Sequence, residues 1–497
     1  MQSDTIPLRA ETLAELGESV PVPSYDRAEL RRSIVHIGVG GFHRAHLATY
    51  VHELCEKGHR GWAIVGGGVL SSDRAIAEAL EAQDDLYCLI TRAAEQTSVE
   101  IIGSIVDYVL AFPDPQPLVA RIASPDTQII SLTITEGGYP VDDSTGRYDP
   151  DSPMAGDGST FALVAAGLDM RRRAGIGPLT VLSCDNVISN GDVARHSLLG
   201  EARRLDASLA GWIETSIAFP NSMVDRITPA TSPSDREWLR THCRIEDRWP
   251  VVTEPFRQWV VEDAFAADRP PLEELDVIVT GDVEPYELAK LRLLNAGHSS
   301  VAYLAALAGI EHVHSAMADA SLRRYLRALL ETEAKPVLPS VAGIQLDAYI
   351  DSLIERFSNP QIRDQISRLC LDGSAKFPKF LLPTIRAQLA SGGPIALSAL
   401  ALAGWCEYLS GSTMTGIHIE PAPDPLLDEA VDRAKASRAN PRAFLDFARV
   451  FPPDIAEHPR FVSAFDRQLR RLRTDGISSA IDSTLNDPEG DDDESHS

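Results

Sequence analysis

The segment HIGVGGFHRAH, residues 36–46, lies between a β-branched run at residues 33–39 and an amphipathic stretch at residues 45–56. Its glycines permit a tight turn from a strand into a helix. In a parallel sheet this turn places the helix N-terminus at the carboxyl edge, where free N–H groups and the helix dipole favour a pyrophosphate. The segment therefore predicts a dinucleotide site, although His43 stands at the sixth position of the GxGxxG pattern, where glycine is usual.

Further strand-like runs follow this segment and alternate with helical patterns. They lie at residues 63–69, 87–91, 99–110, 128–135 and 179–184. Strands that alternate with helices form parallel βαβ units. We therefore expect an α/β fold with a Rossmann-type, doubly wound N-terminal domain, preceded by a polar lead-in that contains several prolines.

The second half of the chain has a different pattern. From Pro285 onward, Leu, Ala and Arg recur at helical spacing and prolines separate the segments. This pattern predicts an all-helical C-terminal domain, with domain bounds at residues 1–284 and 285–480. The last stretch, residues 481–497, carries seven acidic residues and no Lys or Arg, which is typical of a disordered solubilising tail.

The composition excludes several classes of partner. The chain has 497 residues, 44% hydrophobic and 24% charged, as in a globular protein of two domains. The net charge, 46 − 72 = −26, disfavours nucleic acid and anionic membrane surfaces. Apolar runs are too short for a membrane span of about 20 residues, and the first residues lack the basic and apolar regions of a signal peptide.

Cysteine and histidine usage argues against disulfides and metal. The six cysteines lie far apart without a CxxC pair, which predicts a reduced, cytoplasmic protein. Five histidines surround the glycine turn, but no cysteine or carboxylate accompanies them at the spacing of a tetrahedral site. We therefore predict no metal, and nothing in the sequence indicates an obligate protein partner. The histidines are His36, His43, His46, His52 and His59.

An acidic residue after the second strand commonly holds the adenosine ribose of a dinucleotide. Asp73, just beyond the run at residues 63–69, is the candidate. The alternative is that Asp73 only satisfies the first turn of the following helix. Arg74 beside it could accept a 2′-phosphate, so NADP use stays open.

The stretch YELAKLRLLNAGHSSVAYLAAL, residues 286–307, opens the helical domain. On an α-helix its Lys290, Asn295 and His298 fall at about 0°, 140° and 80°, on one side. A lysine whose pKa is lowered by burial can act as general base for alcohol oxidation, and an asparagine amide can hold the oxygen as it becomes alkoxide. A solvated lysine and a structural asparagine fit the same spacing.

Six motifs in order resemble the polyol-specific long-chain dehydrogenases, and the resemblance runs over residues 22–481. They are GVGGFHRAH (38–46), SLTITEGGY (131–139), SCDN (183–186), FPNSMVDRITP (219–229), the Lys290/Asn295/His298 helix and FSNPQIRDQISRLCLDGSAKFPKF (357–380). The resemblance implies a Rossmann-type N-terminal domain, a helical C-terminal domain and zinc-independent oxidation of a small polyol to a ketose with NAD. D-Mannitol, oxidised to D-fructose, is the expected substrate.

The resemblance also implies roles for individual residues. Lys290 matches the general base, Asn186 and Asn295 match the pair that stabilises the alkoxide, and Glu287 matches a carboxylate of the proton exit. The positions that match polyol-binding residues are Asp225, His298, Arg368 and Lys376. The positions that match the NAD site are Ile37, Gly38, Val39, Gly40, Gly41, Phe42, His43, Arg44, Asp73 and Glu136. Ser72 departs from relatives that are acidic there, which weakens the inference of strict NAD use.

Other functions fit parts of this pattern. Within the family, D-arabinitol 4-dehydrogenases and fructuronate reductases are the alternatives, because a uronate carboxylate would also bind Arg368 and Lys376. Outside it, a non-catalytic NAD-binding sensor would need the glycine turn alone. The combination of Lys290, Asn186 and Asn295 favours an enzyme, because a sensor has no need of a base.

Overall fold

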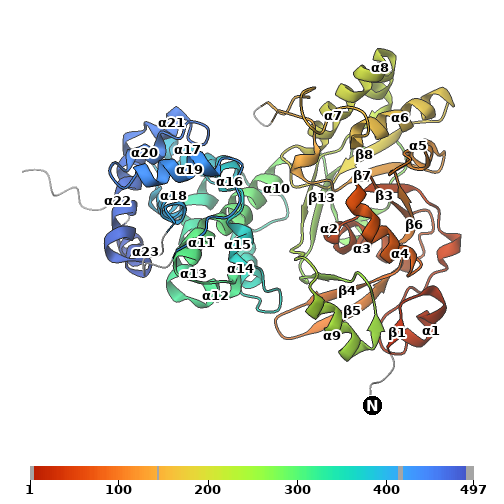
Figure 1. The fold of residues 1–497 in the computed structure, drawn as a ribbon, viewed down its shortest axis with the longest axis horizontal. Helices are drawn as coiled ribbons and strands as arrows, with labels where there is room; N and C mark the ends of the chain where they lie inside the picture. Colours follow the sequence, from red (N-terminus) through yellow and green to blue (C-terminus); the bar gives the residue numbers. More distant parts are fainter. Residues whose placement is uncertain (1–4, 143–144, 412–417, 488–497) are drawn as a thin grey trace, which may run out of the picture. The chain divides into compact units, whose positions relative to one another are not determined.

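A computed structural model describes residues 5–142, 145–411 and 418–487. It divides into two compact units, Met1–Glu284 and Pro285–Ser497. A six-stranded, all-parallel sheet forms the centre of the N-terminal unit (Figure 1). In spatial order its strands are β6 (Ile105–Leu110), β3 (Ile64–Gly68), β2 (Ile34–Ile37), β7 (Ile129–Leu132), β8 (Leu179–Ser183) and β9 (Ile217–Ala218).

Helices cover both faces of this sheet. One face packs against α2 (Gly41–Ala45), α3 (Leu47–Glu56) and α4 (Arg74–Glu81). The other packs against α5 (Gln116–Ala123), α6 (Thr160–Arg173), α7 (Asn190–Leu205) and α8 (Ala207–Ser216). β2 serves both cores, with Ile34 in the first and Val35 in the second. Each such aliphatic side chain contributes about 1.5–3 kcal/mol by leaving water, and the arrangement confirms the Rossmann-type prediction.

Two predicted strands lie outside the parallel sheet. β4 (Tyr87–Arg92) pairs antiparallel with β5 (Thr97–Ile102), and β12 (Val251–Thr253) joins them in a separate sheet. The expectation of a single series of parallel units was wrong here. Only residues 93–96 connect β4 to β5, and a parallel crossover needs a dozen or more residues, whereas a hairpin needs only a short turn.

The run at residues 99–110, expected as one strand, forms parts of two strands, because the extended segment is interrupted at Gly103. A Cβ atom on Gly103 would lie 2.7 Å from the Cγ atom of Pro23. Arg27 donates hydrogen bonds of 2.9 and 2.6 Å to the carbonyl oxygens of Gly103 and Ile105. The N-terminal segment therefore contacts the chain where β5 ends and where β6, which belongs to the parallel sheet, begins.

The lead-in expected to be merely polar is part of the fold. β1 (Ile6–Pro7) pairs with β11 (Ile245–Glu246). Leu8, Leu16 and Val20 are buried in a third core with the β4–β5 hairpin. The lead-in has too few apolar residues for a periodic pattern, and the core around them comes from distant parts of the chain.

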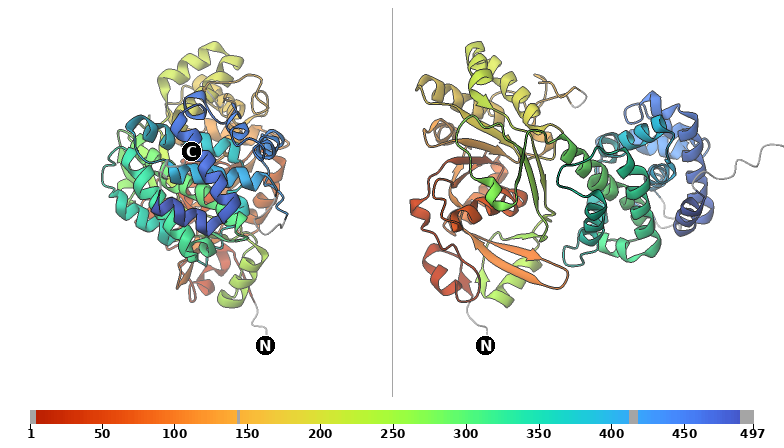
Figure 2. Two further views of the ribbon diagram at one scale, coloured as in Figure 1. Left: turned by 90° about the vertical axis from the view of Figure 1, so that its left-hand side faces the viewer. Right: turned by 180° about the vertical axis from the view of Figure 1, so that it is seen from behind.

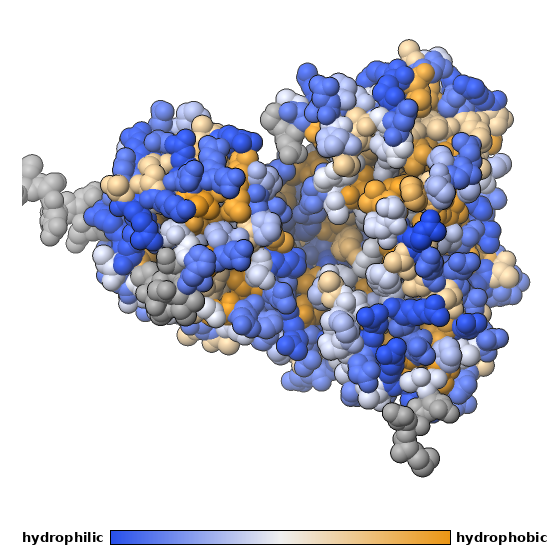
Figure 3. Space-filling model, viewed as in Figure 1, coloured by the Kyte–Doolittle hydropathy of each residue, from blue (hydrophilic) through white to orange (hydrophobic). Residues whose placement is uncertain are grey.

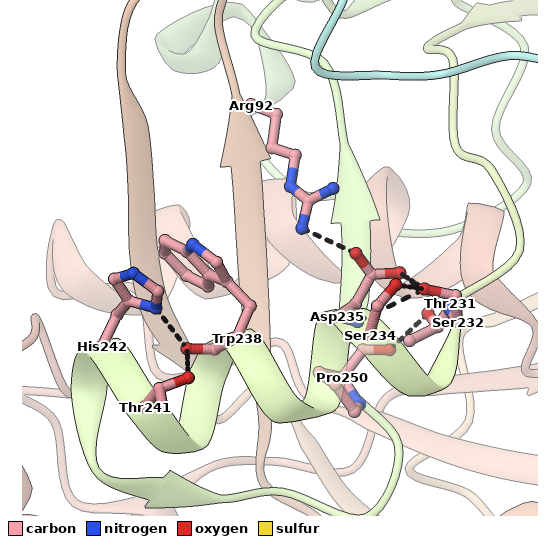
Figure 4. A network of polar contacts seen from close by, with 9 residues as sticks. All are labelled: Arg92, Thr231, Ser232, Ser234, Asp235, Trp238, Thr241, His242 and Pro250. Carbon is pink, nitrogen blue, oxygen red and sulfur yellow. Dashed lines mark hydrogen bonds and ion pairs between the residues drawn. The ribbon is translucent and has the colours of Figure 1, made fainter.

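A polar network begins helix α9 (Pro233–Cys243) (Figure 4). The backbone N–H of Ser232 donates to the Asp235 carboxylate (2.7 Å), and the N–H of Asp235 donates to Ser232 Oγ (3.3 Å). Arg92 of the β4–β5 sheet forms a 2.6 Å ion pair with Asp235. The capping box thus also ties α9 to that sheet.

The described residues of the C-terminal unit form helices joined by loops, without a β-strand (Figure 2), as predicted. An isolated bridge joins His312 to Gln365. All fourteen residues of α18 (Ala396–Leu409) are buried, as expected for a helix that is apolar all round. The other elements are α10 (Glu284–Ala289), η6 (Lys290–Asn295), α11 (Ala296–Leu307), α12 (Val313–Ala318), α13 (Ala320–Ala328), η7 (Leu329–Ala334), η8 (Lys335–Val337), α14 (Leu346–Phe357), α15 (Ile366–Leu369), α16 (Gly373–Phe380), α17 (Leu382–Ser391), α19 (Leu427–Ala436), α20 (Arg442–Leu445), α21 (Pro453–Ala456), α22 (Pro459–Asp475) and α23 (Ile477–Asn486).

The start of the predicted acidic tail is corrected by α23. This helix continues to Asn486, so residues 481–486 are ordered helix rather than tail. Ile481 is fully buried, and the Thr484 hydroxyl donates to Gln468 Oε1 (2.7 Å). A single buried apolar residue amid polar neighbours gave no helical pattern to detect. Residues 488–497 lie outside the described part of the chain.

The surface agrees with the acidic composition. Hydrophilic side chains cover much of the visible surface, with smaller hydrophobic patches among them (Figure 3). Within the described residues, no helix is both long and apolar enough to cross a membrane.

A half-buried acid between α4 and β4, Asp85, predicts a pH-dependent stability. Burial raises the pKa of Asp85 to about 6, with a smaller opposing effect from Arg27. The folded state therefore binds this proton more tightly than the unfolded chain does, and the stability should fall as pH rises from about 4 to about 6. Asp85→Asn should remove this fall and raise the free energy of unfolding at pH 7 by about 1–2 kcal/mol.

Urea unfolding at pH 4 and pH 7 measures this difference. Asn tolerates the positive φ of 60° at position 85, so the substitution adds no backbone strain. Glu78→Gln, an exposed acid on α4, is the matched control and should change neither value. If Asp85→Asn raises the free energy of unfolding equally at pH 4 and pH 7, the protonation of Asp85 does not cause the pH dependence.

Candidate active site

The glycine turn after β2 has the geometry of a phosphate-binding loop. Gly38 has φ +92°, and a Cβ atom there would lie 2.2 Å from the carbonyl oxygen of Thr133, so no other residue fits. The N–H of Gly40 donates to the carbonyl of Gly38 (2.7 Å), and α2 begins at Gly41. The helix N-terminus thus lies at the carboxyl edge of the sheet, as the sequence predicted.

The side chain of His43 explains the departure from GxGxxG. It is fully buried and stacks on His36 of β2, with 3.3 Å between ring centroids. The His36 ring is held by Ser131 Oγ (2.8 Å) and Thr133 Oγ1 (2.9 Å). The stacked rings of His36 and His43 therefore occupy the space between α2 and β2. A glycine at position 43 would let the helix pack closer to the strand.

Arg44 also points into the protein. Its guanidinium is fully buried, lies 5.2 Å from the centre of the Tyr87 ring, and donates to the carbonyl oxygens of Gly40 and Trp249. Like the buried Ile37, Val39 and His43, it can therefore face a ligand only through its backbone.

Asp73 lies at the start of α4, beyond the end of β3. Its Oδ2 atom accepts hydrogen bonds from the N–H groups of Val69 (2.8 Å) and Leu70 (2.9 Å). Both bonds go to one oxygen, so the carboxylate is oriented with its Oδ1 atom turned away from them. Asp73 therefore binds backbone N–H groups, as the alternative role for this residue required. These groups belong to the loop before α4 and not to the first turn of the helix.

Asn186 stands on a braced loop after β8. Its side chain is exposed, and its Nδ2 atom lies 3.4 Å from Oε1 of Glu136, which follows β7. Beneath it, the buried carboxylate of Asp185 accepts hydrogen bonds from the N–H groups of Ile134 (3.0 Å) and Thr135 (2.7 Å). The Asp185 carboxylate therefore ties the loops after β7 and β8 together and brings Asn186 and Glu136 to the same edge.

Further contacts of Asp185 strengthen this brace. The hydroxyl of Tyr139 donates to its Oδ2 atom (2.7 Å). Burial raises the pKa of Asp185, although these three donors act in the opposite direction. Thr135 has φ +64°, a strained value for a β-branched residue and one that collects at functional sites. Sequence reasoning missed Asp185, although it stands beside Asn186 in the SCDN motif.

The VDRITP motif, residues 224–229, lies against the glycine turn. Asp225 is buried on β10 (Ser222–Asp225), which pairs with β13 (Gln258–Glu262). Arg226 donates to the carbonyl oxygens of Glu254 (3.1 Å) and Ala45, so it anchors the end of α2. A Cβ atom on Gly41 would meet the Thr228 methyl group at 3.5 Å.

The histidines near the turn have structural partners. His46 Nε2 contacts the carbonyl of Gln258 (3.0 Å), His52 Nδ1 contacts the hydroxyl of Tyr25 (2.7 Å), and His59 contacts Glu274 (3.0 Å). In the described part of the chain, no three His, Cys, Asp or Glu side chains are grouped so as to hold a metal ion.

In the C-terminal unit, the helix that carries Lys290 is not a regular α-helix. Residues Lys290–Asn295 form the π-helical turn η6 between α10 and α11. A π-helix bonds residue i to residue i+5, so residues five apart follow one another along the axis. Asn295 therefore lies above Lys290, and His298 follows at α-helical i+3 spacing. A π-helical turn therefore reduces the offset of about 140° expected between Lys290 and Asn295, and the three residues stay on one side of the helix.

Two of these three polar residues are buried, and Asn295 is half-buried. Lys290 and His298 are each 8% exposed. The Oδ1 atom of Asn295 is buried and accepts no hydrogen bond from any residue that the structure describes. Since an amide can turn to exchange its oxygen and nitrogen, this position can offer a substrate either a donor or an acceptor.

An aromatic ring and an ion pair lie near His298. Its ring stacks on Phe357 at the end of α14, with 3.8 Å between ring centroids. Arg368 of α15 forms two hydrogen bonds, 2.8 and 2.5 Å, with the Asp364 carboxylate. Burial alone would raise the pKa of Asp364, but Arg368, with a smaller contribution from His298, holds it below its usual value.

Lys376 and Glu287 complete the predicted set in this unit. The Nζ atom of Lys376 on α16 donates to the carbonyl of Leu369 (3.3 Å), and α16 packs against both η6 and α11. Glu287 lies half-buried on α10, one turn before Lys290. The structure thus brings Lys290, Asn295, His298, Arg368 and Lys376 into one group of packed helices.

A Rossmann-type domain with a glycine turn, joined to a helical domain with a Lys–Asn–His group on one side of a helix, defines a two-domain dehydrogenase. Comparison with known proteins is more specific. Residues 32–274 match the mannitol dehydrogenase Rossmann domain, and residues 282–473 match the mannitol dehydrogenase C-terminal domain. The chain therefore belongs to the mannitol dehydrogenase family.

Individual relatives cover nearly the whole chain. Mannitol 2-dehydrogenase of Phaeosphaeria nodorum is 41% identical over 96% of this chain and 85% of its own. The structure of Pseudomonas fluorescens mannitol 2-dehydrogenase in a ternary complex with NAD and D-mannitol is 41% identical with a TM-score of 0.88, over 97% of this chain and 100% of that one. A D-sorbitol dehydrogenase in substrate-free form is 36% identical with a TM-score of 0.87, over 96% and 100%.

Proposed function

We propose that this enzyme oxidises D-mannitol to D-fructose with NAD as the hydride acceptor, and that it needs no metal. The group of Lys290, Asn295 and His298 carries the proposal, because it supplies a base, an amide and a third polar group on one side of a helix. The 41% identical relative solved with NAD and D-mannitol supports the choice of coenzyme and substrate.

The residues of the N-terminal unit fit a dinucleotide. The space that a Cβ atom on Gly38 would need is taken by the Thr133 carbonyl, so the turn is tight enough for backbone N–H groups at Gly40 and Gly41 to bind a pyrophosphate. Asp73, oriented by its two backbone bonds, would accept hydrogen bonds from ribose hydroxyls and repel a 2′-phosphate. The bound nicotinamide supplies the hydride acceptor.

The chain's own residues handle the proton and the oxygen. Lys290 in its neutral form takes the hydroxyl proton of the carbinol, and Glu287, one helical turn away, passes it toward solvent. Asn186 and Asn295 donate amide hydrogens to the oxygen as it becomes alkoxide and then carbonyl. Asp225, His298, Arg368 and Lys376 hold the remaining hydroxyls. Oxidation of one polyol gives one ketose, one NADH and one proton, so low pH favours the reverse reaction.

A substrate panel tests this assignment. With NAD, D-mannitol should exceed D-sorbitol, D-arabinitol and D-mannonate by at least tenfold in kcat/KM, or about 1.4 kcal/mol of transition-state binding. A preference for D-sorbitol would instead follow the second structural relative. NADH binding without turnover of any polyol would indicate a sensor. Dialysis against a chelator should leave the rate unchanged, and a loss restored by zinc would contradict the lysine mechanism.

A further inference from the structure

Two residues of the proposed site stand on different sheets of the N-terminal unit. Asn186 follows β8 of the parallel sheet, and Asp225 ends β10, an edge strand of the three-stranded sheet that contains β13 (Figure 1). Strand pairing joins β8 to β7 and β9, and it joins β10 to β13. The register of a shared sheet therefore does not set the position of the Asn186 amide relative to the Asp225 carboxylate.

The side chain of Asn190, the first residue of α7, joins the two sheets. It is fully buried, and its Nδ2 atom donates to the carbonyl oxygens of Asp185 (3.0 Å) and Ser222 (2.8 Å). Its Oδ1 atom accepts the N–H of Ser222 (2.9 Å). The amide thus binds both backbone groups of Ser222, as a neighbouring strand would, and its remaining N–H binds the carbonyl just before Asn186.

Further contacts bring the same segments together. The Ser222 hydroxyl donates to the carbonyl of Ser183, the last residue of β8 (2.6 Å). A Cβ atom on Gly191 would lie 2.5 Å from the carbonyl oxygen of Phe219, so a glycine is needed where the start of α7 approaches the segment before β10. The first residue of β10 is therefore held both by α7 and by the end of β8.

We propose that Asn190 is a positioning residue of the oxidation, which sets the place of the Asn186 amide relative to the Asp225 carboxylate. This rests on the proposed function, in which Asn186 donates to the alkoxide and Asp225 holds a hydroxyl of the substrate. The Asp185 carbonyl belongs to the peptide group that precedes Asn186, and Ser222 begins the strand that ends at Asp225. The Asp185 carboxylate ties the same loop to the loop after β7, whereas Asn190 ties it to β10.

Asn190→Ala in the full-length enzyme tests this role. With D-mannitol and NAD, kcat should fall by about 10- to 100-fold and KM for mannitol should rise by about 3- to 10-fold, because two groups that face the substrate lose their fixed separation. The dissociation constant of NADH, measured by titration calorimetry, should stay unchanged. Ser222→Ala removes the hydroxyl but keeps both backbone bonds to Asn190, so it should cause smaller losses of the same kind.

Two double variants separate positioning from a general loosening of the fold. In Asn190→Ala/Asn186→Ala the losses of kcat should not add, because Asn190 acts on kcat through the Asn186 amide. In Asn190→Ala/Asp225→Ala the increases of KM should not add, because Asn190 acts on KM through the Asp225 carboxylate. A structural role of Asn190 alone would not divide between kcat and KM in this way.

Asn221→Ala is the matched control. The Asn221 side chain accepts the N–H groups of Gly191 (2.9 Å) and Asp192 (3.2 Å), so it also joins the start of α7 to the segment before β10. These bonds reach the helix and not the loop that carries Asn186. The variant should therefore lower the midpoint of thermal unfolding, as Asn190→Ala does, but leave kcat and KM unchanged.

The other outcomes overturn the inference. Wild-type kcat and KM in a folded Asn190→Ala would do so, as would additive losses in the double variants or equal kinetic losses in Asn221→Ala. If Asn190→Ala loses NADH binding and its cooperative thermal transition, Ser222→Ala decides, and unchanged kinetics in that variant would overturn the role. If the wild type oxidises no polyol, the proposed function itself fails, whereas a wild type that oxidises mannitol and an unaffected Asn190→Ala remove only the positioning role.

Discussion

Lys290→Ala is expected to lower the kcat of mannitol oxidation by about 10²–10⁴ while NADH binding stays near that of the wild type. Hydride can leave the carbinol carbon only as its hydroxyl proton departs, so a base must lie within hydrogen-bond reach. Lys290 is the buried basic group at the head of the π-helical turn, and Asn295 follows it on the same face. The coenzyme contacts proposed for the N-terminal unit are untouched by the substitution.

The pH profile separates loss of the base from loss of structure. In the wild type, kcat/KM for oxidation should rise with pH as the base loses its proton, and Lys290→Ala should abolish that rise. Small primary amines in the buffer should restore part of the rate. Lys379→Ala, an exposed lysine on α16, should behave as the wild type. If Lys290→Ala keeps both the rate and its pH dependence, the base lies elsewhere, and His298 is the first residue to examine.

Local patterns predicted the part of the fold that positions the coenzyme. The β-branched run before Gly38 predicts a strand, and the glycines predict a tight turn after it. The structure has this turn, and only glycine fits at position 38 beside the Thr133 carbonyl. Asn186 was placed correctly at the end of β8 for a similar reason, since parallel strands bring their carboxyl ends to one edge. These features depend on neighbours in sequence or on a general rule of sheets.

The features that the sequence did not predict depend on contacts between distant segments. The chain leaves the parallel sheet at the β4–β5 hairpin, which pairs with β12 from more than a hundred residues later. Asp185 resembles any acid after a strand until its bonds to Ile134 and Thr135 are known.

The π-helical turn shows how the spacing of candidate residues along a sequence can be read with the wrong helix type. Spacing selected Lys290, Asn295 and His298 as one side of an α-helix, with Asn295 far around the axis from Lys290. Nothing in KLRLLN, residues 290–295, distinguishes a π-helical turn from an α-helical one. The wider turn still leaves Lys290 and Asn295 on the same side of the helix, so the roles of these residues stay a prediction.

Asn186→Ala is expected to lower kcat by about 10²–10³, through loss of one donor to the developing alkoxide. The KM for mannitol and the dissociation constant of NADH should change far less, because the amide acts mainly where charge develops. Unlike Lys290→Ala, this variant should keep the rise of kcat/KM with pH. An effect on KM alone would mean that Asn186 binds the ground state of the substrate and does not stabilise the alkoxide.

Asp185→Asn tests whether the position of the Asn186 amide depends on the hydrogen bonds that the Asp185 carboxylate accepts. The carboxylate accepts the N–H groups of Ile134 and Thr135, and an amide NH₂ in its place would face one of these donors. The loop should shift slightly, and since small misplacements of reacting groups are costly, kcat should fall by about tenfold with NADH binding retained. Asp192→Asn, an exposed acid in the first turn of α7, is the control.

In the double variant Asp185→Asn/Asn186→Ala the two losses of kcat should not add, because Asp185 acts through the amide that is already missing. Additive losses would show that Asp185 stabilises the site independently of Asn186.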